Sequence, residues 1–213
     1  MRFSKPLARN PWPHDMAITV EDHPFPLNLL LFVRQAWQLE VDADIPKLLP
    51  LPARGNSKAP DSASLPEWGT RWQTAWDRAW TWYQIADSSR PEYPTQESMR
   101  QMQETMRQVM QPGQPLHPSV PPLWTADYDW DGIDQDAFNA WDQSLAPKIL
   151  TDVERQNLSS LIPAWESGMD TVIVLPYAGY FAQRISRRHL AVSASTRNNP
   201  ESYRQALQTA WAG

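Results

Sequence analysis

Residues 67–85 read EWGTRWQTAWDRAWTWYQI, which is the strongest periodic pattern in the chain. Four tryptophans, Trp68, Trp72, Trp76 and Trp80, recur at every fourth position. An α-helix turns about 100° per residue, so these side chains drift by only about 40° per step and share one face. Charged residues occupy the other side. The pattern predicts an amphipathic helix whose aromatic face packs in the core.

A second apolar stripe follows after a proline-containing break. Its members are Met99, Met102, Met106, Val109 and Met110. This spacing fits one helix face, with Thr95 as the N-cap and Pro112-Gly113 after the end. We expect the two helices to form an antiparallel αα-hairpin. Such stripes are more often core than binding surface, but an exposed aromatic face would suit a sugar or a peptide.

Three segments of the C-terminal third have strand character. The run TVIVL at 171–175 is apolar throughout, and segments 180–185 and 189–195 follow it at short intervals. We expect a small, mainly antiparallel sheet built from these segments, with residues 16–20 as an added strand.

The remaining segments are predicted to be helical. The run 27–39 is apolar nearly all round and predicts a buried helix, although a buried strand over 29–33 fits the same residues. Asp134 should cap a helix over 135–145. Thr151 and Glu154 form a capping box for a helix that bends or restarts at Pro163. Asn199-Pro200 should begin a terminal helix.

These elements predict an α+β fold, with the Trp/Met-rich hairpin packed on the sheet. Residues 42–66 are rich in Pro and Ser and read as a long surface loop or a linker. We expect one domain over 1–213. An alternative division separates a mainly helical part, 1–120, from an α+β part, 121–213.

Composition excludes several classes of protein. The chain has 213 residues, 41% hydrophobic and 20% charged, which is typical of a globular protein. A net charge of -5 argues against a nucleic-acid partner. No cysteine occurs, so disulfides and thiolate chemistry are excluded. We find no secretory leader, and the longest apolar run is far too short to span a membrane, so a cytoplasmic location is expected.

Alternating carboxylates form the first candidate site. Asp127, Asp129 and Asp131 precede Gly132, which resembles the opening of a calcium loop. The twelfth position is Phe138 in place of the bidentate glutamate, so the pattern is incomplete. The residues could hold Ca²⁺ or Mg²⁺. They could equally be acidic flanks that favour the positive end of a helix dipole.

Histidines and carboxylates near the N-terminus form a second candidate. His14, Asp15, Glu21, Asp22 and His23 include the residue types that bind transition metals or act as a general base. No directional spacing supports that chemistry. A polar surface loop is the alternative.

Arginines between two predicted strands form the third candidate. Arg184, Arg187 and Arg188 precede His189, and guanidinium groups bind phosphates and carboxylates well. Residues 125–170 hold ten acids and two bases, whereas 171–213 hold five bases and one acid. These opposite blocks either pair within the fold or make a dipolar surface that orients a partner.

The sequence therefore favours a non-catalytic interaction protein, such as an adaptor, an inhibitor or a structural component, without a cofactor. We expect it to bind a protein partner through charged surfaces, and no membrane. The expected contacts are Arg184, Arg187, Arg188, Asp129 and Asp131. The alternative is a metal-assisted hydrolase with Asp127, Asp129 and Asp131 as ligands and His189 as general base. No Gly-rich phosphate loop or nucleophile elbow occurs.

Overall fold

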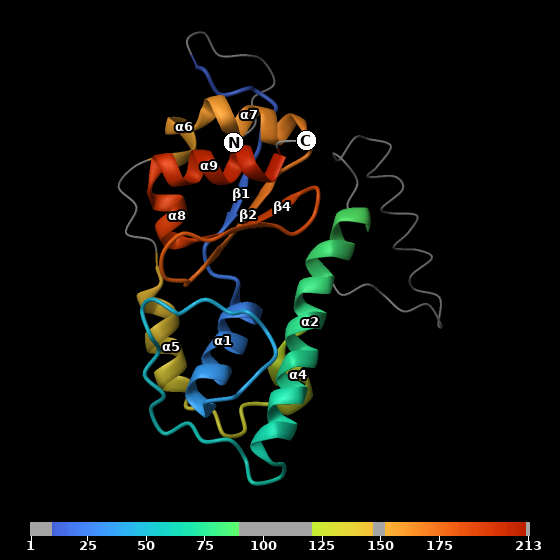
Figure 1. Cartoon of the computed structure of the whole chain (residues 1–213), viewed down its shortest axis with the longest axis vertical. Coiled ribbons are helices and arrows are strands. Elements are labelled where there is room, and N and C mark those ends of the chain that lie inside the picture. The colour runs from blue at the N-terminus through green and yellow to red at the C-terminus, as the bar shows by residue number, and fades with distance from the viewer. Residues whose placement is uncertain (1–9, 90–120, 147–151, 212–213) are drawn as a thin grey trace.

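The computed structural model describes residues 10–89, 121–146 and 152–211 (Figure 1). Within these ranges, a four-stranded sheet consists of β1 (Thr19–Glu21), β2 (Thr171–Leu175), β3 (Ala182–Arg184) and β4 (His189–Ser193). The helices are α1 (Phe25–Trp37), α2 (Leu65–Ser89), α4 (Trp124–Tyr128), α5 (Gln135–Ser144), α6 (Val153–Gln156), α7 (Leu158–Glu166), α8 (Ala194–Asn198) and α9 (Pro200–Trp211). The predicted α+β class is confirmed. The second helix of the expected hairpin, with Thr95 and the methionines, lies outside the described residues.

The sheet is mixed, so the prediction of a mainly antiparallel sheet is wrong. Its strand order is β1-β2-β4-β3, and only β3 runs antiparallel to its neighbour. Segment 176–188 joins β2 to β4, and it is long enough for the crossover of about a dozen residues that parallel pairing requires. β3 forms within that crossover and pairs with β4 at the edge.

Alternation along the strands creates a core on each side of the sheet. Ile173, Leu175 and Ala191 face the cluster made with α1, α2, α4 and α5. Val172 and Leu190 face the cluster made with α6, α7 and α9. Successive strand residues point to opposite faces, so an apolar run such as TVIVL is buried on both. Figure 1 shows α7 and α9 on one side of the strands, away from α1.

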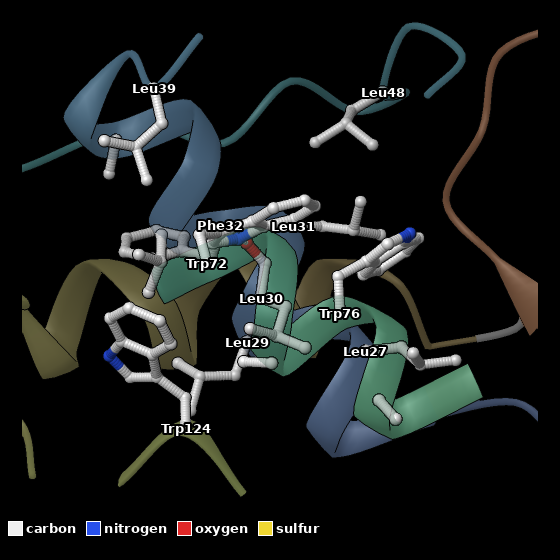
Figure 2. Packing of buried hydrophobic residues seen from close by; sticks show 14 of the residues in the cluster. Leu27, Leu29, Leu30, Leu31, Phe32, Leu39, Leu48, Trp72, Trp76 and Trp124 are labelled. Atoms are coloured by element: carbon white, nitrogen blue, oxygen red, sulfur yellow. Dashed lines mark hydrogen bonds between the residues drawn. The ribbon is translucent and has the colours of Figure 1, made fainter. Parts of the chain in front are cut away.

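The predicted aromatic face of α2 packs mainly against α1. Trp68, Trp72 and Trp76 are buried, whereas Trp80 is half-buried. The Trp72 indole donates a hydrogen bond to the Leu30 carbonyl at 2.6 Å. α1 covers the apolar run 27–37, which confirms the helical reading over the competing strand. Figure 2 shows Trp72 close to Leu31 and Phe32 of this helix. The paired indole satisfies its N–H, so the large ring is buried without a lost hydrogen bond.

The helix ends predicted from the sequence are confirmed in part. The Asp134 carboxylate caps α5 by accepting from Ala137 N at 3.0 Å, as predicted. Asn199 accepts from the first turn of α9 in the same way. The residue that caps α6 is Asp152, and Thr151 lies outside the described residues. The helix restarts at Asn157 and not at Pro163, which α7 accommodates near its middle.

Most of the proline-rich segment 42–66 forms a long surface loop that circles α1, but α2 already begins at Leu65 (Figure 1). Backbone hydrogen bonds fasten it at several points. Ala178 N donates to Lys47 O at 2.7 Å, and Lys58 N donates to Gly132 O at 3.0 Å. These bonds anchor the loop to the rest of the fold near Lys47 and Lys58. In the described part of the chain, no helix combines the length and apolar character needed to cross a bilayer.

Candidate functional site

The acidic residues of α4 and of the loop before α5 differ in their contacts. Asp127 pairs with Arg78 at 2.7 Å, and Asp129 ends α4 with a φ of 53°. Asp131 is exposed. Among the described residues, His, Asp and Glu side chains nowhere gather in the groups of three or more that could hold a metal ion. The Gly132 carbonyl accepts from the Trp37 indole at 2.9 Å, so this turn is anchored to α1.

The predicted arginine site is engaged within the chain. Arg188 forms an ion pair with Asp170, and its side chain is mostly buried. The Arg184 guanidinium lies 4.9 Å from the centre of the Trp211 ring. Arg187 Nε donates to the Ser167 carbonyl at 3.3 Å. The three arginines predicted to contact a partner therefore all make contacts within the chain.

Arg197 is a buried cation that the sequence analysis missed. Its side chain is only 7% exposed and pairs with Glu154 at 2.9 Å and with Asp22 at 3.4 Å. The acidic and basic blocks therefore pair within the fold through Glu154 and Asp170. A buried ion pair of this kind fixes the relative position of the elements that carry it.

The N-terminal histidines lie apart. His14 contacts Asp15 at 3.6 Å, whereas His23 faces Asp142 of α5 at 3.7 Å. Glu21 points elsewhere, toward Tyr83 of α2. The structure therefore does not bring these side chains together as one metal site or acid–base centre.

Glu21 and Tyr83 form a polar contact between β1 and α2. The Tyr83 hydroxyl donates to the two Glu21 carboxylate oxygens, at 3.1 and 3.2 Å. Burial raises the pKa of the Glu21 carboxyl, and the Tyr83 hydrogen bond offsets only part of this effect. Burial and the Glu21 charge together raise the pKa of Tyr83. The Tyr83 ring in turn packs edge-on against His189.

Serines near His189 have structural roles. The His189 Nδ1 atom lies 2.9 Å from Ser186 Oγ, which also accepts from two backbone N–H groups of the β3–β4 turn. Ser193 caps α8, and both Ser193 and Ser195 donate to the Gly179 carbonyl. These bonds fasten the turn and the strand end, which is the usual role of serine at such positions.

A pocket of about 230 Å³ lies at the carboxyl ends of β2 and β4, and we call it the strand-end pocket. Its lining residues are Asp22, Leu49, Pro50, Ser144, Leu145, Ala146, Val174, Leu175, Pro176, Ala194, Arg197 and Asn198. Ligands of open sheets with parallel strands bind at this edge, because the loops after the strands converge there. In the sequence, the signal for this pocket is the polar pair Arg197-Asn198 that follows the strand segment 189–195.

A second pocket of about 200 Å³ lies between α2, the 44–46 loop and the β3 edge, and we call it the aromatic pocket. Its lining residues are Asp44, Pro46, Trp76, Trp80, Gln84, Tyr177, Phe181, Gln183, Arg184 and Ile185. Two tryptophans of the predicted stripe thus contribute to a pocket as well as to the core.

Comparison with protein-family models, with curated proteins and with solved structures finds no match to this chain.

Proposed function

We propose that this chain is a non-catalytic interaction protein that binds an apolar side chain of a protein partner in the strand-end pocket. The observation that carries the proposal is a cavity lined mainly by apolar residues, with the exposed Leu49 in its wall. Leu49 lines the pocket and is 62% exposed, and Leu51 on the same loop is 63% exposed. Exposed leucines next to an apolar cavity are typical of a protein-interaction surface.

The walls of the pocket are preorganised. Leu49 N donates to Pro176 O at 2.8 Å, which holds the loop against the end of β2. The Trp141 indole donates to Pro50 O at 2.8 Å, which ties the same loop to α5. A partner that binds here would order few additional groups, so more of the contact energy contributes to affinity.

The charged groups of the pocket support binding more than catalysis. Asp22 and Arg197, the titratable side chains that line it, pair with each other at 3.4 Å. Arg197 also pairs with Glu154. Each of these two charged groups is therefore already engaged by an oppositely charged side chain of the same chain. The other residues that line the pocket are mainly apolar, and its two charged side chains pair with each other.

Site-specific photo-crosslinking tests the proposal. A photoreactive amino acid replaces Leu51 in one protein and Leu65 in a matched control, and each is expressed in the cells that make this chain. Leu65 is also an exposed leucine, but it lies at the start of α2, outside the strand-end pocket. We expect the probe at position 51 to capture a defined protein that the probe at position 65 does not capture.

Affinity measurements with that protein complete the test. Ala146→Trp should fill the mouth of the pocket, and Leu49→Asp should place a charge at its edge. Burial of a leucine-sized side chain contributes about 1.5–3 kcal/mol, so each change should raise Kd about 10- to 100-fold. The control Leu65→Asp should leave Kd unchanged. Equal capture at both positions, or equal weakening by all three variants, would refute the proposal.

A further inference from the structure

The aromatic pocket combines four rings in two edge-to-face pairs. Trp76 and Trp80 lie one turn apart on α2, with ring centres 5.5 Å apart. Tyr177 and Phe181 come from the segment after β2, with ring centres 4.8 Å apart. Trp76 and Tyr177 are buried, and they fix the positions of the half-buried Trp80 and Phe181. The two outer rings therefore present apolar surface at the pocket in a defined geometry.

Polar side chains on three different elements surround these rings. Asp44, Gln84 and Gln183 come from the loop before Lys47, from α2 and from β3. Within the described part of the chain, no hydrogen bond or ion pair engages any of these three side chains. The pocket thus offers acceptors and donors that intrachain contacts leave to a ligand or to water.

Arg184 adds a fixed cation to the wall. Its Nε donates to Ser186 O at 3.2 Å and its Nη1 donates to Ala210 O at 3.3 Å. The Trp211 ring lies beside the guanidinium, so the side chain is held in place. With Asp44 as the one carboxylate of the lining, the charges of the pocket balance. A ligand with a large net charge would gain little here.

We propose that the aromatic pocket binds a single neutral sugar ring. The C–H face of a sugar packs on an aromatic ring, while its hydroxyls donate to and accept from carboxylate and amide groups around the rim. A volume of about 200 Å³ is below the range of about 300–1,000 Å³ for drug-sized ligands, which suits one ring. The pocket shares no lining residue with the strand-end pocket, so this proposal goes beyond the proposed function.

Two other occupants fit the pocket less well. A basic side chain of a partner would suit the rings and Asp44, but Arg184 in the same wall would repel it. A nucleobase stacks best on a broad ring face or between parallel faces. Both ring pairs of the pocket are edge-to-face, with interplanar angles of 84° and 82°, and offer no parallel faces.

Titration of the whole chain with a panel of methyl glycosides tests this site. The panel contains the methyl glycosides of glucose, galactose, mannose and N-acetylglucosamine, and binding is followed by saturation-transfer NMR and by tryptophan fluorescence. We expect at least one sugar to bind with a saturable, millimolar Kd. Tetramethylammonium and adenosine serve as the cationic and nucleobase probes.

Variants assign any binding to the pocket. Asp44→Ala should weaken the sugar about tenfold or more, because it removes a charged acceptor. The matched control Asp42→Ala changes an exposed aspartate of the same loop that lies outside this pocket. Trp80→Ala should abolish binding, whereas Tyr180→Ala, at an exposed ring outside the pocket, should not.

Three results would overturn the proposal. One is the absence of saturable binding by every sugar of the panel. Another is tighter binding of tetramethylammonium or adenosine than of any sugar. The third is equal loss of sugar binding in Asp42→Ala and Asp44→Ala. Asp44 is exposed, so its replacement tests the site without disturbing the core.

Discussion

Replacement of Arg197 by methionine tests whether the buried ion pairs hold the sheet edge together. The Arg197 side chain is 7% exposed, and it pairs with Glu154, which is 13% exposed, and with Asp22, which is 29% exposed. These three residues lie on α8, on α6 and directly after β1. Methionine retains the length of the stem but removes the cation, so two carboxylates would remain close together without compensation.

The expected decrease in the free energy of unfolding follows from the burial of the two carboxylates. Removal of one partner from a buried pair typically destabilises by about 3–5 kcal/mol. Asp22 retains more contact with water than Glu154, so most of the penalty comes from Glu154. Since domains are stable by about 5–15 kcal/mol in total, Arg197→Met should be much less stable than the wild type. The double variant Arg197→Met/Glu154→Gln should recover part of this loss, because the stranded charge is gone.

Urea unfolding at neutral pH, followed by circular dichroism, measures the free energy of unfolding. The matched control is Arg155→Met, which breaks an ion pair with Asp152 whose members are 57% and 55% exposed. Exposed pairs contribute about 0–1 kcal/mol, so the control should change stability little. If Arg197→Met destabilises no more than Arg155→Met, the argument from buried charge is wrong.

Two further predictions concern the glycine turns and the β1–α2 contact. Gly132→Ala should lower the melting temperature more than Gly179→Ala, because both positions have positive φ but only at Gly132 would an added Cβ clash with the Lys58 carbonyl. Thermal unfolding of both variants checks this, and equal shifts would contradict it. Glu21→Gln should raise stability at neutral pH, because burial raises the pKa of Glu21 and folding therefore favours its protonated form. This gain should disappear below the ordinary carboxyl pKa of about 4.3, where the wild type is also neutral, and urea midpoints across pH would refute the reasoning if the gain grew on acidification.

The aromatic helix was predictable from the sequence because its pattern is local. Four tryptophans at i, i+4 spacing determine both the helix and its buried face. Trp68, Trp72 and Trp76 are buried as the spacing requires. Asp134 and Asn199 were also identified correctly, since a side chain that caps a helix acts on backbone groups within three residues.

The order of the strands was not predictable in the same way. The sequence identifies segment 171–175 and the β3–β4 turn, but pairing of β1 with β2 joins residues about 150 positions apart. Local propensity carries no information about such a contact. A chain of consecutive hairpins would place β3 between β2 and β4. In the structure β3 lies at the edge, and β2 pairs directly with β4 in parallel.

The candidate site was harder to predict than the fold for a related reason. Charge counting identified the acidic and basic blocks, but it did not show which residues pair. Arg188 lies beside Asp170, and Arg197 lies beside Glu154. From the sequence, Leu49 is recognisable only as one residue of a proline-rich loop. Its position at the mouth of the strand-end pocket depends on the hydrogen bond from its backbone N–H to Pro176.

Internal pairing of charges also changes where recognition is expected. A guanidinium that pairs with a carboxylate of its own chain must break that pair before it can bind a partner's carboxylate, so the exchange yields little free energy. The exposed part of a leucine side chain has no such competitor, because it contacts only water before binding. Leu49 and Leu51 can therefore contribute the burial of their exposed surface to a complex, whereas Arg188 would first have to give up its ion pair with Asp170. The affinity of a partner that binds these leucines should therefore depend only weakly on salt concentration. A steep loss of affinity between low and high ionic strength would instead favour recognition through the charged surfaces.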